Sequence, residues 1–127
     1  MQDKVTFEYA IIRVVPKVER EEFFNVGVIL FSKRKRFLGI KYHVDNNKLS
    51  VIAPDLEIAL LNDYLSAWKL ICNGGKSGGK IGEFEISDRF RWLAACRSTI
   101  VQSSKTHPGL CDNPEQALND IFEKYVL

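Results

Sequence analysis

The sequence has few cysteines and no long hydrophobic run. Its 127 residues include 3 cysteines, an odd number without a CxxC pair, which is typical of a reducing compartment rather than of a secreted disulfide framework. The longest apolar run, from Val26 to Phe31, is far shorter than the roughly 20 residues that a membrane-spanning helix needs. The first residues also lack the continuous apolar core of a signal peptide. We therefore expect a soluble, cytoplasmic protein without a membrane association.

The charge balance is nearly even, with 18 Lys and Arg against 16 Asp and Glu, a formal net charge of +2. This total gives no strong chain-wide attraction to nucleic acid or to an anionic membrane. Hydrophobic residues make up 46% and charged residues 27% of the chain, as in ordinary globular proteins. A chain of this length can bury enough surface to fold without a metal or a disulfide. We expect one domain over residues 1–127 and no cofactor.

A zinc site would have to use Cys96, His107 and Cys111, with His43 as a fourth candidate. These residues lack the close paired spacing of zinc fingers and ribbons. We therefore expect no metal site, and we interpret the cysteines as small apolar side chains.

Three strands are predicted in the first third of the chain. Val5 to Val15 alternates apolar and polar residues, the period of a strand with one buried face. Residues 25–31 form a short apolar run suited to a strand covered on both faces, and Gly27 within it indicates a bulge or a close backbone approach. A tight basic connection, residues 33–36, then leads into a third strand at 37–42.

The later elements are mainly helical. Apolar residues spaced three and four apart predict a helix over 55–72, and a shorter helix is expected after Ser87 as its cap. Residues 98–102 favour a strand, 105–110 resemble a turn, and Asn113 with Pro114 starts a final helix. Residues 48–53 are a short helix or an irregular stretch, and the glycine-rich 74–82 is expected to be flexible. The fold class is α+β, an antiparallel sheet of three N-terminal strands plus a later strand, packed on one face by about three helices.

Two local motifs have weak support. Gly74 to Ile81 nearly matches the phosphate-binding pattern GxxxxGK[ST], but it has Ile81 in place of the hydroxyl residue and follows a helix instead of a strand. The basic residues Lys33, Arg34, Lys35 and Arg36 could contact phosphate backbones, although such residues also protect a sheet edge from pairing. Nucleic acid is thus an unlikely partner. We interpret Trp68, Trp92 and the tyrosines as mainly core residues.

The densest group of polar residues comes directly after the helix expected from Ser87. Arg97 could bind a carboxylate or phosphate there, and Ser98 could donate a hydrogen bond to it. His107 could act as an acid or base if the turn returns it to that strand. No GxSxG elbow or His-Glu motif accompanies these residues. The candidate binding residues are therefore Arg97, Ser98, Thr99, Gln102 and His107, and no catalytic residue is assigned. The alternative is that these side chains only bond the backbone where helix, strand and turn meet.

Three stretches give the chain a resemblance, over nearly its whole length, to a bacterial family known as domain of unknown function 3037. They are residues 9–16 with 25–30, residues 71–75, and residues 90–102. The chain departs from the family pattern at Cys96, where the family usually has proline. The resemblance implies a protein of unassigned activity, and similar proteins are often encoded beside HipA-like serine/threonine kinases.

The leading hypothesis is a non-catalytic interaction or regulatory module, with a HipA-like kinase as a candidate protein partner. One alternative is an enzyme or anion-binding protein that uses Arg97, Ser98, Gln102 and His107. Another is nucleic-acid binding through Lys33 to Arg36, which predicts salt-sensitive retention on DNA or RNA.

Overall fold

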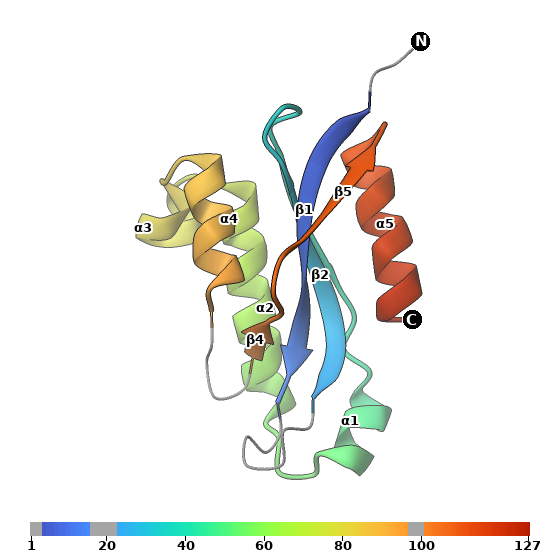
Figure 1. The fold of residues 1–127 in the computed structure, drawn as a ribbon. Helices are drawn as coiled ribbons and strands as arrows, with labels where there is room; N and C mark the ends of the chain where they lie inside the picture. The colour runs from blue at the N-terminus through green and yellow to red at the C-terminus, as the bar shows by residue number, and fades with distance from the viewer. Residues whose placement is uncertain (1–3, 16–22, 97–100) are drawn as a thin grey trace.

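The computed structural model describes residues 4–15, 23–96 and 101–127. The elements, in chain order, are β1 (Val5–Val14), β2 (Phe24–Ser32), β3 (Phe37–Tyr42), α1 (Asn46–Ile52), α2 (Ile58–Asn73), η2 (Lys76–Gly78), α3 (Gly79–Gly82), α4 (Ile86–Ala94), β4 (Val101–Ser103), β5 (His107–Cys111) and α5 (Pro114–Tyr125). An antiparallel sheet is packed by helices (Figure 1). The predicted α+β fold class is therefore confirmed.

The long strand β1 organises the sheet, whose order is β3-β2-β1-β4, with β5 also paired to β1. Residues Ile12 to Val14 of β1 pair with β4, while Val5 to Tyr9 pair with β5. Ser104 fills the position between the two short strands: its N–H donates to the Ile11 carbonyl and its Oγ accepts from the Ile11 N–H, both at 2.8 Å. One edge of β1 is thus occupied by two successive segments of the same chain.

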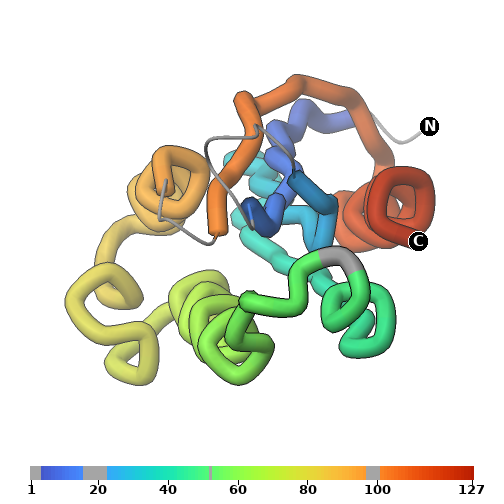
Figure 2. Tube along the Cα trace, turned by 90° about the horizontal axis from the view of Figure 1, so that it is seen from below, coloured from blue at the N-terminus to red at the C-terminus, as the bar shows by residue number. Residues whose placement is uncertain are grey.

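Helices cover both faces of the sheet, so the prediction of helices on one face was wrong. Seen from below, α5 lies on one side and α2, α3 and α4 on the other (Figure 2). On β1, Ala10, Ile12 and Val14 belong to the core beneath α2 and α4, whereas Phe7 and Ile11 belong to a second core beneath α5. The cause is visible in the strand itself, because apolar side chains occupy both of its alternating faces.

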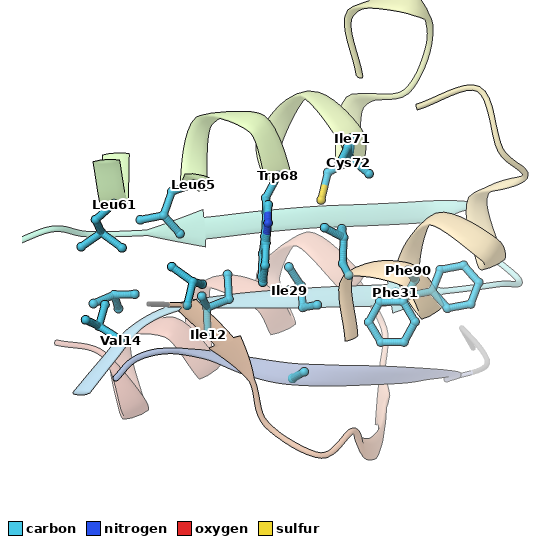
Figure 3. Packing of buried hydrophobic residues seen from close by; sticks show 14 of the residues in the cluster. Ile12, Val14, Ile29, Phe31, Leu61, Leu65, Trp68, Ile71, Cys72 and Phe90 are labelled. Atoms are coloured by element: carbon cyan, nitrogen blue, oxygen red, sulfur yellow. The ribbon is translucent and has the colours of Figure 1, made fainter. Parts of the chain in front are cut away.

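The larger core lies between α2 and the sheet (Figure 3). Helix α2 confirms the prediction for 55–72, and its buried residues recur on one face: Leu61, Leu65, Trp68, Ile71 and Cys72. At the other end of this core the rings of Phe31 and Phe90 stack with their centroids 5.2 Å apart. Trp68 is buried as predicted, but Trp92 is 40% exposed, because α4 turns only Ile86, Phe90 and Leu93 inward.

The glycine-rich segment is more ordered than predicted, since it forms η2 and α3. The Gly75 N–H donates to the Gly82 carbonyl at 2.7 Å, and a Cβ at Gly82 would overlap that Gly75 backbone. The Arg89 side chain closes the segment by donating from Nη1 to the Ile71 and Cys72 carbonyls, each at 2.8 Å. The Arg89 guanidinium therefore supplies hydrogen-bond donors to carbonyls at the end of α2.

Three local predictions need correction. Glu85, not Ser87, occupies the N-cap position of α4, and no side-chain hydrogen bond is made there. Residues 107–110, expected within a turn, belong to β5 because they complete the edge of β1. Residues 48–53, left open between helix and irregular chain, fall mostly in α1, where Asp45 accepts from the Lys48 N–H at 3.0 Å.

Two other predictions are confirmed. At the start of α5, Asn113 accepts from the N–H groups of Glu115 and Gln116. Within β2, Gly27 lies at a register shift in its pairing with β1, and its backbone closely approaches Lys41.

Candidate functional site

The polar segment predicted from sequence is only partly described. Arg97, Ser98 and Thr99 lie outside the described residues, while Gln102 lies on β4 and His107 on β5. The register places Gln102 opposite Arg13 and His107 opposite Tyr9. Tyr9 and Arg13 are four residues apart on one strand, or about 13 Å along it. Gln102 and His107 therefore share a strand edge without adjoining, and their joint role stays a prediction.

A polar row crosses the sheet at the C-terminal end of β1. Arg13 has Asn25 opposite it on β2 and Gln102 opposite it on β4. The register shift in β2 creates this row. Val28 belongs to the core beneath α5, and simple alternation would place Asn25 on the other face. Instead Val26 lies in the core beneath α2, and the Asn25 amide contacts α5.

Arg13 is held without a counter-ion among the described residues. Its guanidinium carbon lies 4.2 Å from the centre of the Phe23 ring, an arrangement that favours a cation over an aromatic face. Its Nε is buried and has no hydrogen-bond partner. An unpartnered polar atom of this kind requires an explanation, because desolvation without compensation costs free energy.

Asn25 lacks a hydrogen-bond donor where Arg13 lacks an acceptor. Its Nδ2 donates to the Tyr125 carbonyl at the end of α5, at 3.1 Å, and this bond fixes the orientation of the amide. Its Oδ1 is then buried without a donor. A donor on Arg13 and an acceptor on Asn25 thus remain unsatisfied on register-paired residues.

Aromatic hydroxyl and imidazole groups lie farther along the same face. The rings of Tyr9 and His107 are 5.3 Å apart. Burial raises the pKa of Tyr9, and the charge and hydrogen bond of Tyr125 raise it further. Tyr9 therefore stays a neutral hydroxyl at physiological pH.

The basic turn, defined as Lys33 to Arg36, lies at the opposite end of the sheet. All four residues are exposed, and Arg36 approaches Glu85 with an N···O distance of 3.7 Å between highly exposed side chains. Such a pair contributes little to stability. The turn joins β2 to β3, as predicted, with the Arg36 N–H donating to the Lys33 carbonyl at 3.1 Å.

Residues at the end of β5 and the start of α5 line a surface hollow of about 420 Å³. These two element ends lie at the same end of the sheet as the basic turn (Figure 1). We call this hollow the α5 hollow; it is lined by Lys4, Phe7, Leu110, Cys111, Asp112, Asn113, Gln116, Ala117, Asp120 and Ile121. Leu110 is 63% exposed. Burial raises the pKa of the Cys111 thiol and Asp112 raises it further, while Lys35 of the basic turn lies near enough to oppose them.

A second hollow, of about 320 Å³, lies between β2, α1 and the end of α5. It is lined by Phe24, Asn25, Val26, His43, Asp45, Lys48, Leu49, Val126 and Leu127. Asn25 therefore borders this hollow on one side and stands opposite Arg13 on the other.

The described residues offer neither a reactive Cys72 thiol nor a metal-binding cluster. Cys72 is buried in the core, and burial raises the pKa of its thiol to about 12 despite the opposing effect of Arg89. The described residues contain no group of three or more His, Cys, Asp or Glu placed to hold a metal ion. None of the described helices is both long and apolar enough to cross a membrane.

Sequence reasoning missed Arg13 and Asn25. A signal was present at Arg13, which interrupts an apolar strand at positions 11–15, since charged residues are seldom placed in buried segments without a partner. Asn25 carried no such signal, because its face depends on the bulge.

A family model described as "Protein of unknown function (DUF3037)" matches residues 9–126 of the chain. No curated protein and no solved structure matches it.

Proposed function

Since the chain belongs to the DUF3037 family of proteins of unknown function, we propose that it is a non-catalytic protein-interaction module of the bacterial cytoplasm. Its partner is a HipA-like serine/threonine kinase, as the family resemblance suggests. The three free cysteines support a reducing compartment. The observation that carries the proposal is the placement of an exposed basic turn near a hollow whose lining includes apolar side chains.

The α5 hollow supplies the anchoring part of this surface. Phe7, Ala117 and Ile121 give it apolar walls, and Leu110 presents an exposed apolar side chain at its edge. Interfaces gain most of their affinity where a few apolar side chains enter such a depression. A partner therefore inserts an apolar side chain here.

Charge of both signs surrounds the hollow. Asp112 and Asp120 lie in its lining, and Lys33, Arg34 and Lys35 are exposed on the nearby turn. Complementary charges orient a partner and raise its association rate more than they raise its affinity. The partner surface that fits has a basic residue near its apolar anchor and an acidic patch to face the turn.

The direct test is a titration of the purified chain against the purified HipA-like kinase of the same genome, by isothermal calorimetry. Reversing two turn charges, Lys33→Glu with Lys35→Glu, is expected to weaken binding at least about tenfold, and Leu110→Asp is expected to do the same. The matched controls are Lys69→Glu with Lys80→Glu and Val51→Asp, because these residues are also exposed. The controls are expected to bind like the unmodified chain.

Absence of a complex at high micromolar concentration would reject the kinase as partner. A complex that tolerates both turn and Leu110 variants would reject this surface. Salt-sensitive binding of a DNA or RNA duplex that is lost in the turn variant would favour the nucleic-acid alternative instead.

A further inference from the structure

The polar row at the other end of β1 has no part in the proposed kinase surface. Val5 borders the end of the sheet that carries the basic turn, and Arg13 lies eight residues farther along the strand, or about 25 Å away. Arg13 makes a stacking contact with Phe23 but no ion pair with any described carboxylate. A partly buried guanidinium without a counter-charge destabilises a fold unless something binds it.

We propose that Arg13 and Asn25 form a binding site for a carboxylate that carries an N–H donor beside it, the chemistry of the C-terminal residue of a peptide. The site uses Arg13 as the donor to the carboxylate and Asn25 as the acceptor from the neighbouring N–H. It requires no residue of the predicted Arg97 to His107 segment.

The Arg13 guanidinium is suited to bind a carboxylate. The contact with Phe23, 4.2 Å from the guanidinium carbon to the ring centre, holds the guanidinium over the ring. The unpartnered Nε is one of the two parallel donors, Nε and an Nη, that bind both oxygens of a carboxylate side by side. Lysine could not reproduce this geometry, because its ammonium is a point charge.

Asn25 is suited to accept a hydrogen bond from the N–H of the ligand. Its Nδ2 is committed to the Tyr125 carbonyl, so the buried Oδ1 is the acceptor left for a ligand. Arg13 and Asn25 are directly paired in the ladder, and the Cβ atoms of such pairs lie about 5 Å apart. A terminal residue carries its carboxylate and its N–H on one α-carbon, so it offers both groups to two adjoining side chains.

The surroundings leave room for the remainder of a peptide. Asn25 also borders the hollow of about 320 Å³ between β2, α1 and the end of α5. Phe24, Leu49 and Val126 give this hollow apolar walls, while Lys48 and Asp45 place charges at its edge. A chain that continues from the bound terminal residue can therefore bury apolar surface there.

The probe for this site is N-acetylglycine, which has a carboxylate and an adjacent N–H. Arg13 Nε–H and Asn25 Nδ2 resonances are followed by NMR during titration with N-acetylglycine, acetate and inorganic phosphate. We expect saturable shifts of both resonances with N-acetylglycine below about 20 mM, and at least about fivefold weaker binding of acetate and of phosphate.

Variants of Arg13 test whether N-acetylglycine binds at this residue. Arg13→Gln and Arg13→Lys are each expected to weaken N-acetylglycine binding at least about tenfold, while Arg34→Gln on the exposed turn leaves it unchanged. A one-bond amide spectrum of each variant verifies that the fold is retained, and the Lys variant keeps the charge if the Gln variant unfolds.

No shift at Arg13 Nε–H at about 20 mM probe would overturn the site. Equal binding of acetate and N-acetylglycine would overturn the role of Asn25, and stronger binding of phosphate would overturn the choice of carboxylate. These outcomes are independent of the kinase titration, since neither Arg13 nor Asn25 lies at the turn or in the α5 hollow.

Discussion

Arg13 and Asn25 stand opposite each other in the ladder between β1 and β2, and each buries one polar atom that has no partner. The two atoms are chemically complementary, since Nε donates and Oδ1 accepts. The bond from Asn25 Nδ2 to the Tyr125 carbonyl fixes the amide with Oδ1 as its remaining acceptor. A ligand that accepts from Nε and donates to Oδ1 would satisfy both atoms at once.

Because its Nε is buried without a partner, Arg13 is expected to lower the free energy of unfolding of the ligand-free chain. Arg13→Met removes the unpartnered donor and keeps an unbranched apolar stem against Phe23, so the free energy of unfolding in urea should stay equal or rise by about 1 kcal/mol. Asn25→Ala should lower it by about 1 kcal/mol, because the Tyr125 carbonyl loses its donor. A large loss in Arg13→Met would show instead that Arg13 is a structural residue.

A second prediction concerns Arg89, which donates to the carbonyls of Ile71, Cys72 and Phe84. Arg89→Ala leaves the two carbonyls at the end of α2 without this charged donor, and the free energy of unfolding should fall by about 3 kcal/mol. Arg89→Lys should recover only part of this loss, because a single ammonium cannot repeat the fork. Urea denaturation measures both.

Arg91 is the matched control on the same helix. It makes a two-point contact with Glu8, at 3.1 and 2.6 Å, but the Arg91 side chain is 56% exposed. Arg91→Ala should therefore cost no more than about 1 kcal/mol. An Arg91 variant as destabilised as Arg89→Ala would contradict the assignment of Arg89 as the residue that closes the glycine segment.

A third prediction uses the Cys72 thiol, whose pKa burial raises from 9.0 to about 12. Between these two values the unfolded chain releases a proton that the folded chain keeps, so stability falls as pH rises. Cys72→Ala removes this contribution. The stability difference between the unmodified chain and Cys72→Ala should be constant from pH 6 to 8 and should narrow by about 1 kcal/mol per pH unit above 9. A constant difference up to pH 11 would show that Cys72 ionises normally in the fold.

Most of the fold could be read from local periodicity. Helix α2, the start of α5 at Asn113 and the hairpin around the basic turn each follow from signals within a few residues. The edge strand β5 could not be predicted in this way, because its short sequence contains Pro108 and Gly109 and becomes a strand only by pairing with β1.

The site was harder to predict than the fold. The α5 hollow is built from Lys4 and Phe7 at the start of the chain and from residues 110–121 near its end. Such a pairing depends on tertiary structure, which no short motif encodes. For Asn25 the obstacle is one residue of register, since a shift of one position exchanges the two faces of a strand.

The last prediction tests this register. Gly27 lies beside the shift, and a Cβ there would be 2.8 Å from the Lys41 carbonyl oxygen and 2.9 Å from the Tyr42 Cβ. Because these neighbours belong to β3 and its ladder, Gly27→Ala must displace backbone, and we expect a loss of about 2 kcal/mol in the free energy of unfolding.

Gly39→Ala is its control, since the added Cβ would meet the end of the Phe37 ring and a Leu118 methyl, which are side-chain atoms that can move. Its loss should be smaller. Gly27→Ala should also shift the Asn25 Nδ2 resonance, because the bulge is what places that amide on the face of α5 opposite Arg13. An unchanged Asn25 resonance together with an unchanged stability would show that the bulge does not depend on glycine.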